Sequence, residues 1–226
     1  MILCLVTDRR RFGGMVEAVV DQARSAVAAG VDLLQIRERD LEAGDLTVLA
    51  SRIVHAARGT KTRVVVNDRL DVALAAGAHG VHLRGDSMAS SVVRQIAPRP
   101  FLIGRSVHTI AEARAESGAD YLVAGTVFPT SSKREVARHL GVDGLRAIVA
   151  ATDIPVLAIG GITTANLADI AAAGAAGAAA IGLLAVRQAA AMCELVDAAR
   201  RSFATGGSPT TNRPSDTVGL VDLSLR

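Results

Sequence analysis

The chain has 226 residues, 50% of them hydrophobic and only 2% aromatic, and its formal net charge is +3. So small a charge, without Lys- or Arg-rich runs interleaved with aromatic residues, excludes an extended nucleic-acid-binding surface. No apolar run reaches transmembrane length before glycine or charge interrupts it, and the two cysteines provide neither a disulfide framework nor a zinc site. We therefore expect a cytoplasmic protein that binds neither nucleic acid nor membrane.

Short β-branched runs alternate with Ala-rich amphipathic stretches along the chain. We expect eight strands at Ile2–Val6, Leu33–Ile36, Arg63–Val66, Gly80–Leu83, Leu102–Ser106, Tyr121–Ala124, Val156–Ile159 and Ala178–Ile181. We expect helices near Val16–Ala28, Ala43–Ala57, Arg69–Ala76, Ala89–Ile96, Ile110–Glu116, Val142–Ala150, Thr164–Ala173 and Gln188–Ser202. This alternation predicts a parallel sheet with right-handed crossovers. Eight units in about 200 residues fit a single (β/α)₈ TIM barrel of the α/β class, with a doubly wound open sheet as the alternative.

A repeated turn supports the barrel. A small-residue–Gly pair ends the helix before each even-numbered strand, at Gly30, Gly77, Gly118 and Gly174, as expected of stacked (βα)₂ quarters. After Ala204 the composition becomes rich in Gly, Ser, Pro and Thr, which is typical of a linker. We therefore predict a barrel over residues 1–204 and a flexible C-terminal tail over 205–226.

Polar or Gly-rich residues follow seven of the eight predicted strands. In a (β/α)₈ barrel the carboxyl ends of the strands share one rim, and active sites form there. In chain order these residues are Gln35, Arg37, Arg39, Asn67, Asp68, His82, Asp86, Ser106, His108, Thr130, Ser132, Lys133, Gly160, Gly161, Ile181 and Gly182. Each could be a structural cap, ion pair or core residue by itself, but their coincidence on one rim predicts a functional site.

The turn after the seventh strand favours a phosphate site. Gly160 and Gly161 precede a predicted helix, so backbone N–H groups can approach an anion near a helix N-terminus. Ile181 and Gly182, after the eighth strand, would form the second wall. The run Arg9–Arg11 has two interpretations, a solvated loop, which we favour, or positive charge at the mouth of a site for anions.

Taken in order, these motifs resemble the thiamine phosphate synthase/TenI family. They are Gln35-Ile36-Arg37-Glu38-Arg39, Val66-Asn67-Asp68, Gly80-Val81-His82-Leu83, Phe128-Pro129-Thr130-Ser131-Ser132-Lys133 and Ile159-Gly160-Gly161-Ile162. The resemblance spans Met1 to about Ala204 and implies a thiamine-biosynthesis enzyme that binds thiazole phosphate at the ends of strands seven and eight. It implies substrate contacts from Gln35, Arg39, Asn67, His82, Ser106, Thr130, Ser132, Gly160, Gly161, Ile181 and Gly182.

The family contains two chemistries. Synthases join a pyrimidine diphosphate to thiazole phosphate and expel pyrophosphate with Mg²⁺, whereas TenI-like tautomerases aromatise a thiazole carboxylate phosphate by a proton shift without a cofactor. The chain departs from the synthase pattern where that pattern has a second metal-binding Asp. Ser87 takes this place, Asp86 falls one residue early, and Arg84 puts a cation where Mg²⁺ would need carboxylate.

We therefore favour the tautomerase, with His108 as the base and Arg37 and Lys133 as further catalytic residues, because imidazole suits a proton shift near neutral pH. The first alternative is the Mg²⁺-dependent synthase, in which Asp68 and Asp86 would hold the metal. The second is a thiazole phosphate binder without catalytic activity. The sequence leaves homo-oligomerisation open.

Overall fold

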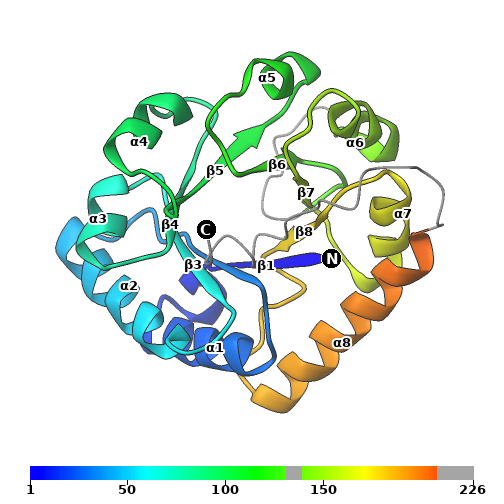
Figure 1. Ribbon diagram of the computed structural model, residues 1–226. Coiled ribbons are helices and arrows are strands. Elements are labelled where there is room, and N and C mark those ends of the chain that lie inside the picture. Colours follow the sequence, from blue (N-terminus) through cyan, green and yellow to red (C-terminus); the bar gives the residue numbers. More distant parts are fainter. Residues whose placement is uncertain (131–138, 208–226) are drawn as a thin grey trace.

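Eight parallel strands form one closed barrel in the computed structural model, which describes residues 1–130 and 139–207. Each strand pairs with the next along the chain, and β8 returns to β1, with Ile2 opposite Gly177 (Figure 1). The strands are β1 Ile2–Val6, β2 Leu33–Ile36, β3 Arg63–Asn67, β4 Gly80–Leu83, β5 Leu102–Val107, β6 Tyr121–Gly125, β7 Val156–Ile159 and β8 Gly177–Ala180. Closure confirms the predicted (β/α)₈ barrel and excludes the open sheet.

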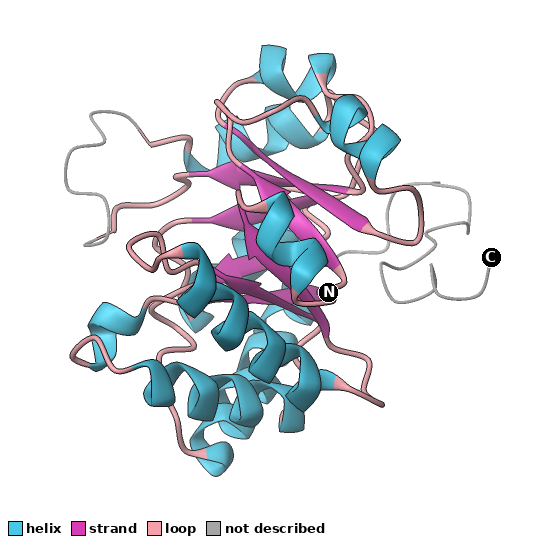
Figure 2. Cartoon of the chain, turned by 90° about the vertical axis from the view of Figure 1, so that its left-hand side faces the viewer, coloured by secondary structure: helices cyan, strands magenta, loops and turns pink. Residues whose placement is uncertain are grey.

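The helices surround the barrel as an outer layer (Figures 1 and 2). They are α1 Val16–Ala28, α2 Ala43–Ala57, α3 Leu70–Ala75, α4 Ser90–Ile96, α5 Ile110–Ala115, α6 Gly141–Val149, α7 Leu167–Ala172 and α8 Ala189–Gly206, with 3₁₀ turns η1 Arg9–Phe12 and η2 Thr164–Asn166. Within the described part of the chain, no helix has the length and apolar character needed to cross a membrane.

Two apolar layers hold the fold together. The larger lies between the strands and the helices and consists chiefly of Val, Leu, Ile and Ala. The smaller fills the barrel interior and contains Cys4, Val6, Leu33, Val65, Leu102, Tyr121, Val123, Leu157 and Ala179. The inner layer fills the barrel below its rim, and in this fold sites form at the carboxyl ends of the strands and in their loops.

The predicted strand bounds are correct to within one residue, and the last strand shows why they are not exact. β8 begins at Gly177, one residue earlier than predicted. A Cβ atom at this position would lie 1.8 Å from the carbonyl oxygen of Ile2, so glycine lets β8 approach β1 closely enough to close the barrel.

The last two helical segments also differ from expectation. The segment predicted at Thr164–Ala173 begins with the η2 turn, and α7 itself starts at Leu167. Helix α8 continues past the predicted end, because Gly206 packs directly against the backbone of Ala168 in α7. The predicted tail lies mostly outside the described residues, as do Ser132 and Lys133, so these remain predictions.

Candidate active site

Two hydrogen-bonded pairs of polar side chains lie at the ends of β2 to β5. The side-chain amide of Gln35 donates to the side-chain oxygen of Asn67 at 3.0 Å, linking β2 to β3. The imidazole Nε2 of His82 lies 2.9 Å from the hydroxyl of Ser106, linking β4 to β5. The structure therefore brings together, as neighbours across strands, residues that are far apart in the sequence.

His82 lies deeper than we expected for a substrate contact. Its side chain is buried, with only 2% of the residue exposed, and its Nδ1 lies 3.3 Å from the hydroxyl of the buried Tyr121. Gly104 leaves room for both rings, since a Cβ there would lie 2.2 Å from Tyr121. Burial lowers the pKa of His82 to about 4, so the ring is neutral near pH 7. Half-buried Ser106 is the member of this pair that can meet a ligand.

His108 follows β5 and is exposed at the rim. Its backbone N–H donates to the Glu112 carboxylate at 2.6 Å, and Thr109 caps α5 by accepting from the Glu112 N–H. Its Nδ1 contacts the carbonyl oxygen of Gly125. Because a carbonyl oxygen only accepts, Nδ1 is the donor in this contact, and in the neutral ring Nε2 has the lone pair. The ring is therefore oriented as a proton acceptor.

Two arginines of the loop after β2 form no ion pair with a carboxylate of the described residues. Arg37 is half-buried and Arg39 is exposed. Burial, and then the positive charge of Arg39, lower the pKa of the Arg37 guanidinium. No carboxylate of residues 1–130 or 139–207 lies within ion-pair distance of either guanidinium. Two like charges without such a partner favour binding of an anion.

A cavity of about 220 Å³ opens beside Arg39, and a compact polar cluster forms one side of it. The lining residues are Ile36, Glu38, Arg39, Leu41, Leu46, Asn67, Asp68, Arg69 and Arg84. One carboxylate oxygen of Asp68 accepts from Ser87, and the other lies 3.3 Å from Arg84. The same guanidinium lies 2.5 Å from Asp86.

The resemblance implied that Asp68 and Asp86 would hold Mg²⁺ in a synthase, but these residues do not fit the ion. Mg²⁺ needs carboxylate oxygens that face the ion, but Arg84 lies against both Asp68 and Asp86. Across the described residues, no group of three or more His, Cys, Asp or Glu side chains could hold a metal ion. The predicted metal ligands therefore form an ion-pair cluster.

The predicted phosphate turn has the backbone that anion binding needs. Gly160 and Gly161 have φ angles of 101° and 64°, and Asn166 fixes the turn by donating to the Gly161 carbonyl at 2.9 Å. The N–H groups of Gly161 and Ile162 donate to no acceptor among the described residues. The same holds for the N–H groups of Gly182 and Leu183, after β8. Backbone donors without partners at adjacent strand ends are suited to a phosphate.

Gly161 is required by packing as well as by any ligand. A Cβ on Gly161 would lie 2.5 Å from the carbonyl oxygen of Pro129, and one on Gly160 would lie 2.4 Å from the Thr126 side chain. The loop after β6 therefore packs on this turn. A larger side chain at Gly161 would therefore disturb the fold as well as any ligand site. Thr130 lies at the end of the described part of this loop.

Arg11 is a residue that sequence reasoning did not place in the site. Its guanidinium lies 3.6 to 3.9 Å from the point where a Cβ of Gly182 would be, over the end of β8. Glu38 positions the η1 turn that carries Arg11, since its carboxylate accepts from the Arg9 N–H at 3.0 and 3.1 Å. The Arg9–Arg11 run was the available signal, but the sequence did not show which arginine lies over the end of β8.

Comparisons with known proteins agree on the family. Residues 3–184 match the model of a family described as thiamine monophosphate synthase. The thiamine-phosphate synthase of Methanoregula boonei is 44% identical over 181 residues, which cover 79% of this chain and 83% of that protein. That of Clostridium botulinum strain Hall is 38% identical over 175 residues, covering 76% and 84%.

Solved structures lead to the same family. The thiamine phosphate pyrophosphorylase of Pyrococcus furiosus has a TM-score of 0.76 at 34% identity and covers 88% of this chain and 96% of its own. A 3-hexulose-6-phosphate synthase at 19% identity, with a TM-score of 0.67, shares the fold alone. The resemblance predicted from the strand-end motifs is confirmed. The chain belongs to the thiamine monophosphate synthase family.

Proposed function

We propose that the protein is a transferase that joins a pyrimidine diphosphate to thiazole phosphate and releases pyrophosphate. The comparisons favour this synthase over the tautomerase that we preferred from the sequence, because the similar curated proteins are named thiamine-phosphate synthase. Those proteins are named as enzymes, which also disfavours a binder without catalytic activity.

The observation that carries the proposal is the presence of two anion-binding regions at separate parts of one rim. The first consists of the N–H groups after β7 and β8 together with Arg11, and suits a single phosphate. The second consists of Arg39 and Arg84, which border the cavity at β2 to β4, with Arg37 on the same loop as Arg39, and suits a more highly charged diphosphate. A synthase must hold one substrate of each kind at the same time.

The chemistry follows from this placement. The bond between the pyrimidine methylene carbon and the diphosphate oxygen breaks as a carbon–nitrogen bond to the thiazole forms, and the electron pair leaves with pyrophosphate. Fixed guanidinium groups beside the diphosphate stabilise this departing charge. Arg39 and Arg84 border the cavity, Arg37 lies on the same loop as Arg39, and Lys133 is a further candidate from the sequence.

Pyrophosphate release tests the proposal. With both substrates present, the protein should release pyrophosphate and form thiamine phosphate in equal amounts, and either substrate alone should give neither. If thiamine phosphate does not form with both substrates, with or without Mg²⁺, the synthase proposal is wrong.

The tautomerase is retained as a second candidate because of one observation, the orientation of His108. With Nδ1 donating to the Gly125 carbonyl, Nε2 can take a proton from a carbon atom of a bound ring. Conversion of the thiazole carboxylate phosphate to its aromatic isomer, monitored in the absence of the pyrimidine substrate, distinguishes this activity from the synthase.

A further inference from the structure

The arrangement of Asp68, Arg84 and Ser87 differs from a metal site in a specific way. Both carboxylate oxygens of Asp68 are engaged, one by the Ser87 hydroxyl and the other by Arg84 at 3.3 Å. The Ser87 hydroxyl also accepts from the Arg84 backbone N–H at 2.9 Å. A positive charge therefore stands at the place where a cation between two carboxylates would be expected.

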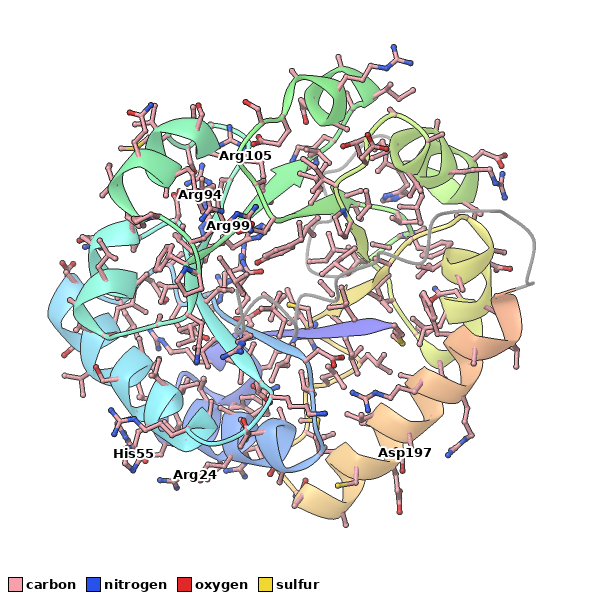
Figure 3. The ribbon with its side chains drawn as sticks, in the orientation of Figure 1. Arg24, His55, Arg94, Arg99, Arg105 and Asp197 are labelled. Carbon is pink, nitrogen blue, oxygen red and sulfur yellow. The ribbon has the colours of Figure 1, made fainter. Side chains whose placement is uncertain are left out.

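The loop that carries Arg84 is held from outside the barrel. Arg105, which lies between α4 and α5 (Figure 3), donates to the carbonyl oxygens of Met88 at 2.8 Å and Gly85 at 2.9 Å. Its own charge is compensated by Glu116, 3.7 Å away, and both side chains are largely buried. These contacts hold residues 85–88 in place, so the position of Arg84 is a property of the fold.

The Arg84 guanidinium still has N–H groups that can donate to a ligand. A guanidinium has five N–H donors in a planar fork. Nη1 and Nη2 each contact one acidic side chain, and the Arg84 side chain remains 40% exposed beside the cavity. Arg39 borders the same cavity, so a diphosphate there would meet two guanidinium groups. Guanidinium binds phosphate oxygens in a bidentate manner, through two parallel N–H donors.

We propose that Arg84 takes the place of a divalent cation and binds the diphosphate directly, together with Arg39. This rests on the proposed synthase function, because it concerns the diphosphate of that reaction and the pyrophosphate it releases. Pyrophosphate binding then needs no added metal, and Asp68 serves to orient Arg84.

Calorimetric titration of the full chain with inorganic pyrophosphate in excess EDTA tests this directly. We expect binding in EDTA, and we expect Arg84→Gln to weaken it by about tenfold or more, as for loss of a charge-assisted bidentate contact. Arg52→Gln is the matched control, because it removes the same charge from the outer surface of α2, where Arg52 pairs with Glu17. The control should bind within about twofold of the parent.

Two results would overturn the proposal: no pyrophosphate binding by the parent in EDTA, or equal binding by the parent and a folded Arg84→Gln variant. Failure of the proposed function is distinguishable, because it would appear as absent turnover while pyrophosphate still binds through Arg84.

A gain-of-function variant gives an independent test. Arg84→Ala combined with Ser87→Asp removes the guanidinium and places a second carboxylate opposite Asp68. We expect this double variant to bind Mg²⁺ alone in calorimetry, and we expect the parent not to. Mg²⁺ binding by the parent as tight as that of the double variant would contradict the proposal, because the parent cluster would then be a metal site despite Arg84.

Discussion

The imidazole Nε2 of His82 lies 2.9 Å from the hydroxyl of Ser106, and this contact connects the barrel interior to the rim. His82 packs beside Tyr121, with ring centroids 5.7 Å apart, and is shielded from solvent. The histidine that we predicted as a direct ligand contact therefore supports Ser106 from below.

Burial of His82 should make the protein less stable in mild acid. Its pKa is about 4 in the fold and 6.5 when unperturbed, so between these pH values the unfolded chain binds the proton more readily. As pH falls from 6.5 to 4, we expect His82 to remove about 3 kcal/mol from the free energy of unfolding. Above pH 6.5 the effect should vanish. Urea denaturation across this range measures it.

His82→Gln should reduce that pH dependence, whereas His55→Gln should preserve it, because His55 is exposed on the outer surface of α2 (Figure 3). Other groups that titrate in this range are common to all three proteins and cancel in the comparison. Identical pH profiles for the parent and His82→Gln would show that His82 is not a buried neutral imidazole.

His108 should separate the two candidate activities. If the protein isomerises the thiazole carboxylate phosphate, His108→Ala should lower that kcat by about 10²–10⁴-fold, the usual contribution of general acid–base catalysis. Thiazole phosphate affinity should change little, because the backbone donors after β7 and β8 are untouched. Steady-state kinetics and calorimetry measure both quantities. Isomerisation at the parent rate would exclude His108 as the base.

Arg11 should contribute to thiazole phosphate binding, since its guanidinium lies over the end of β8. We expect Arg11→Gln to weaken binding by about tenfold, or about 1.4 kcal/mol. Arg10→Gln, in the same η1 turn, should change the affinity by less than about twofold, because Arg10 is solvent-exposed and pairs with Asp8. Calorimetric titration of the parent and the two variants measures these affinities. Equal losses of affinity in both variants would indicate only a general effect of charge.

Gly161→Ala should lower the free energy of unfolding by more than the left-handed backbone of Gly161 alone accounts for. Gly161 and Gly59 have similar φ angles of 64° and 73°, but a Cβ would lie 2.5 Å from Pro129 at the first site and meet nothing within 4 Å at the second. Gly59→Ala should cost about 1 kcal/mol for the left-handed backbone, and Gly161→Ala about 2 kcal/mol more. Equilibrium urea unfolding gives both values. Equal destabilisation by the two substitutions would mean that the loop after β6 can move to make room for the added methyl group.

The sequence by itself determined the strands, their alternation with helices and the rim on which the polar residues lie. Strand bounds are readable because β-branched runs such as Arg63–Asn67 are local features, and a parallel barrel always brings carboxyl ends together. The position of Gln35 and Asn67 at neighbouring strand ends followed from this shared rim, although their hydrogen bond did not. Family motifs could be read for the same reason, since each lies at one strand end.

Only the tertiary structure decided how deep each side chain lies and which partner it meets. His82 lies below the rim because Gly104, on the neighbouring strand β5, leaves space for its ring beside Tyr121 of β6. Arg84 reaches Asp68 because the loop after β4 folds back over β3. Such contacts depend on strand register and loop packing between residues far apart in the chain, and a sequence pattern records neither.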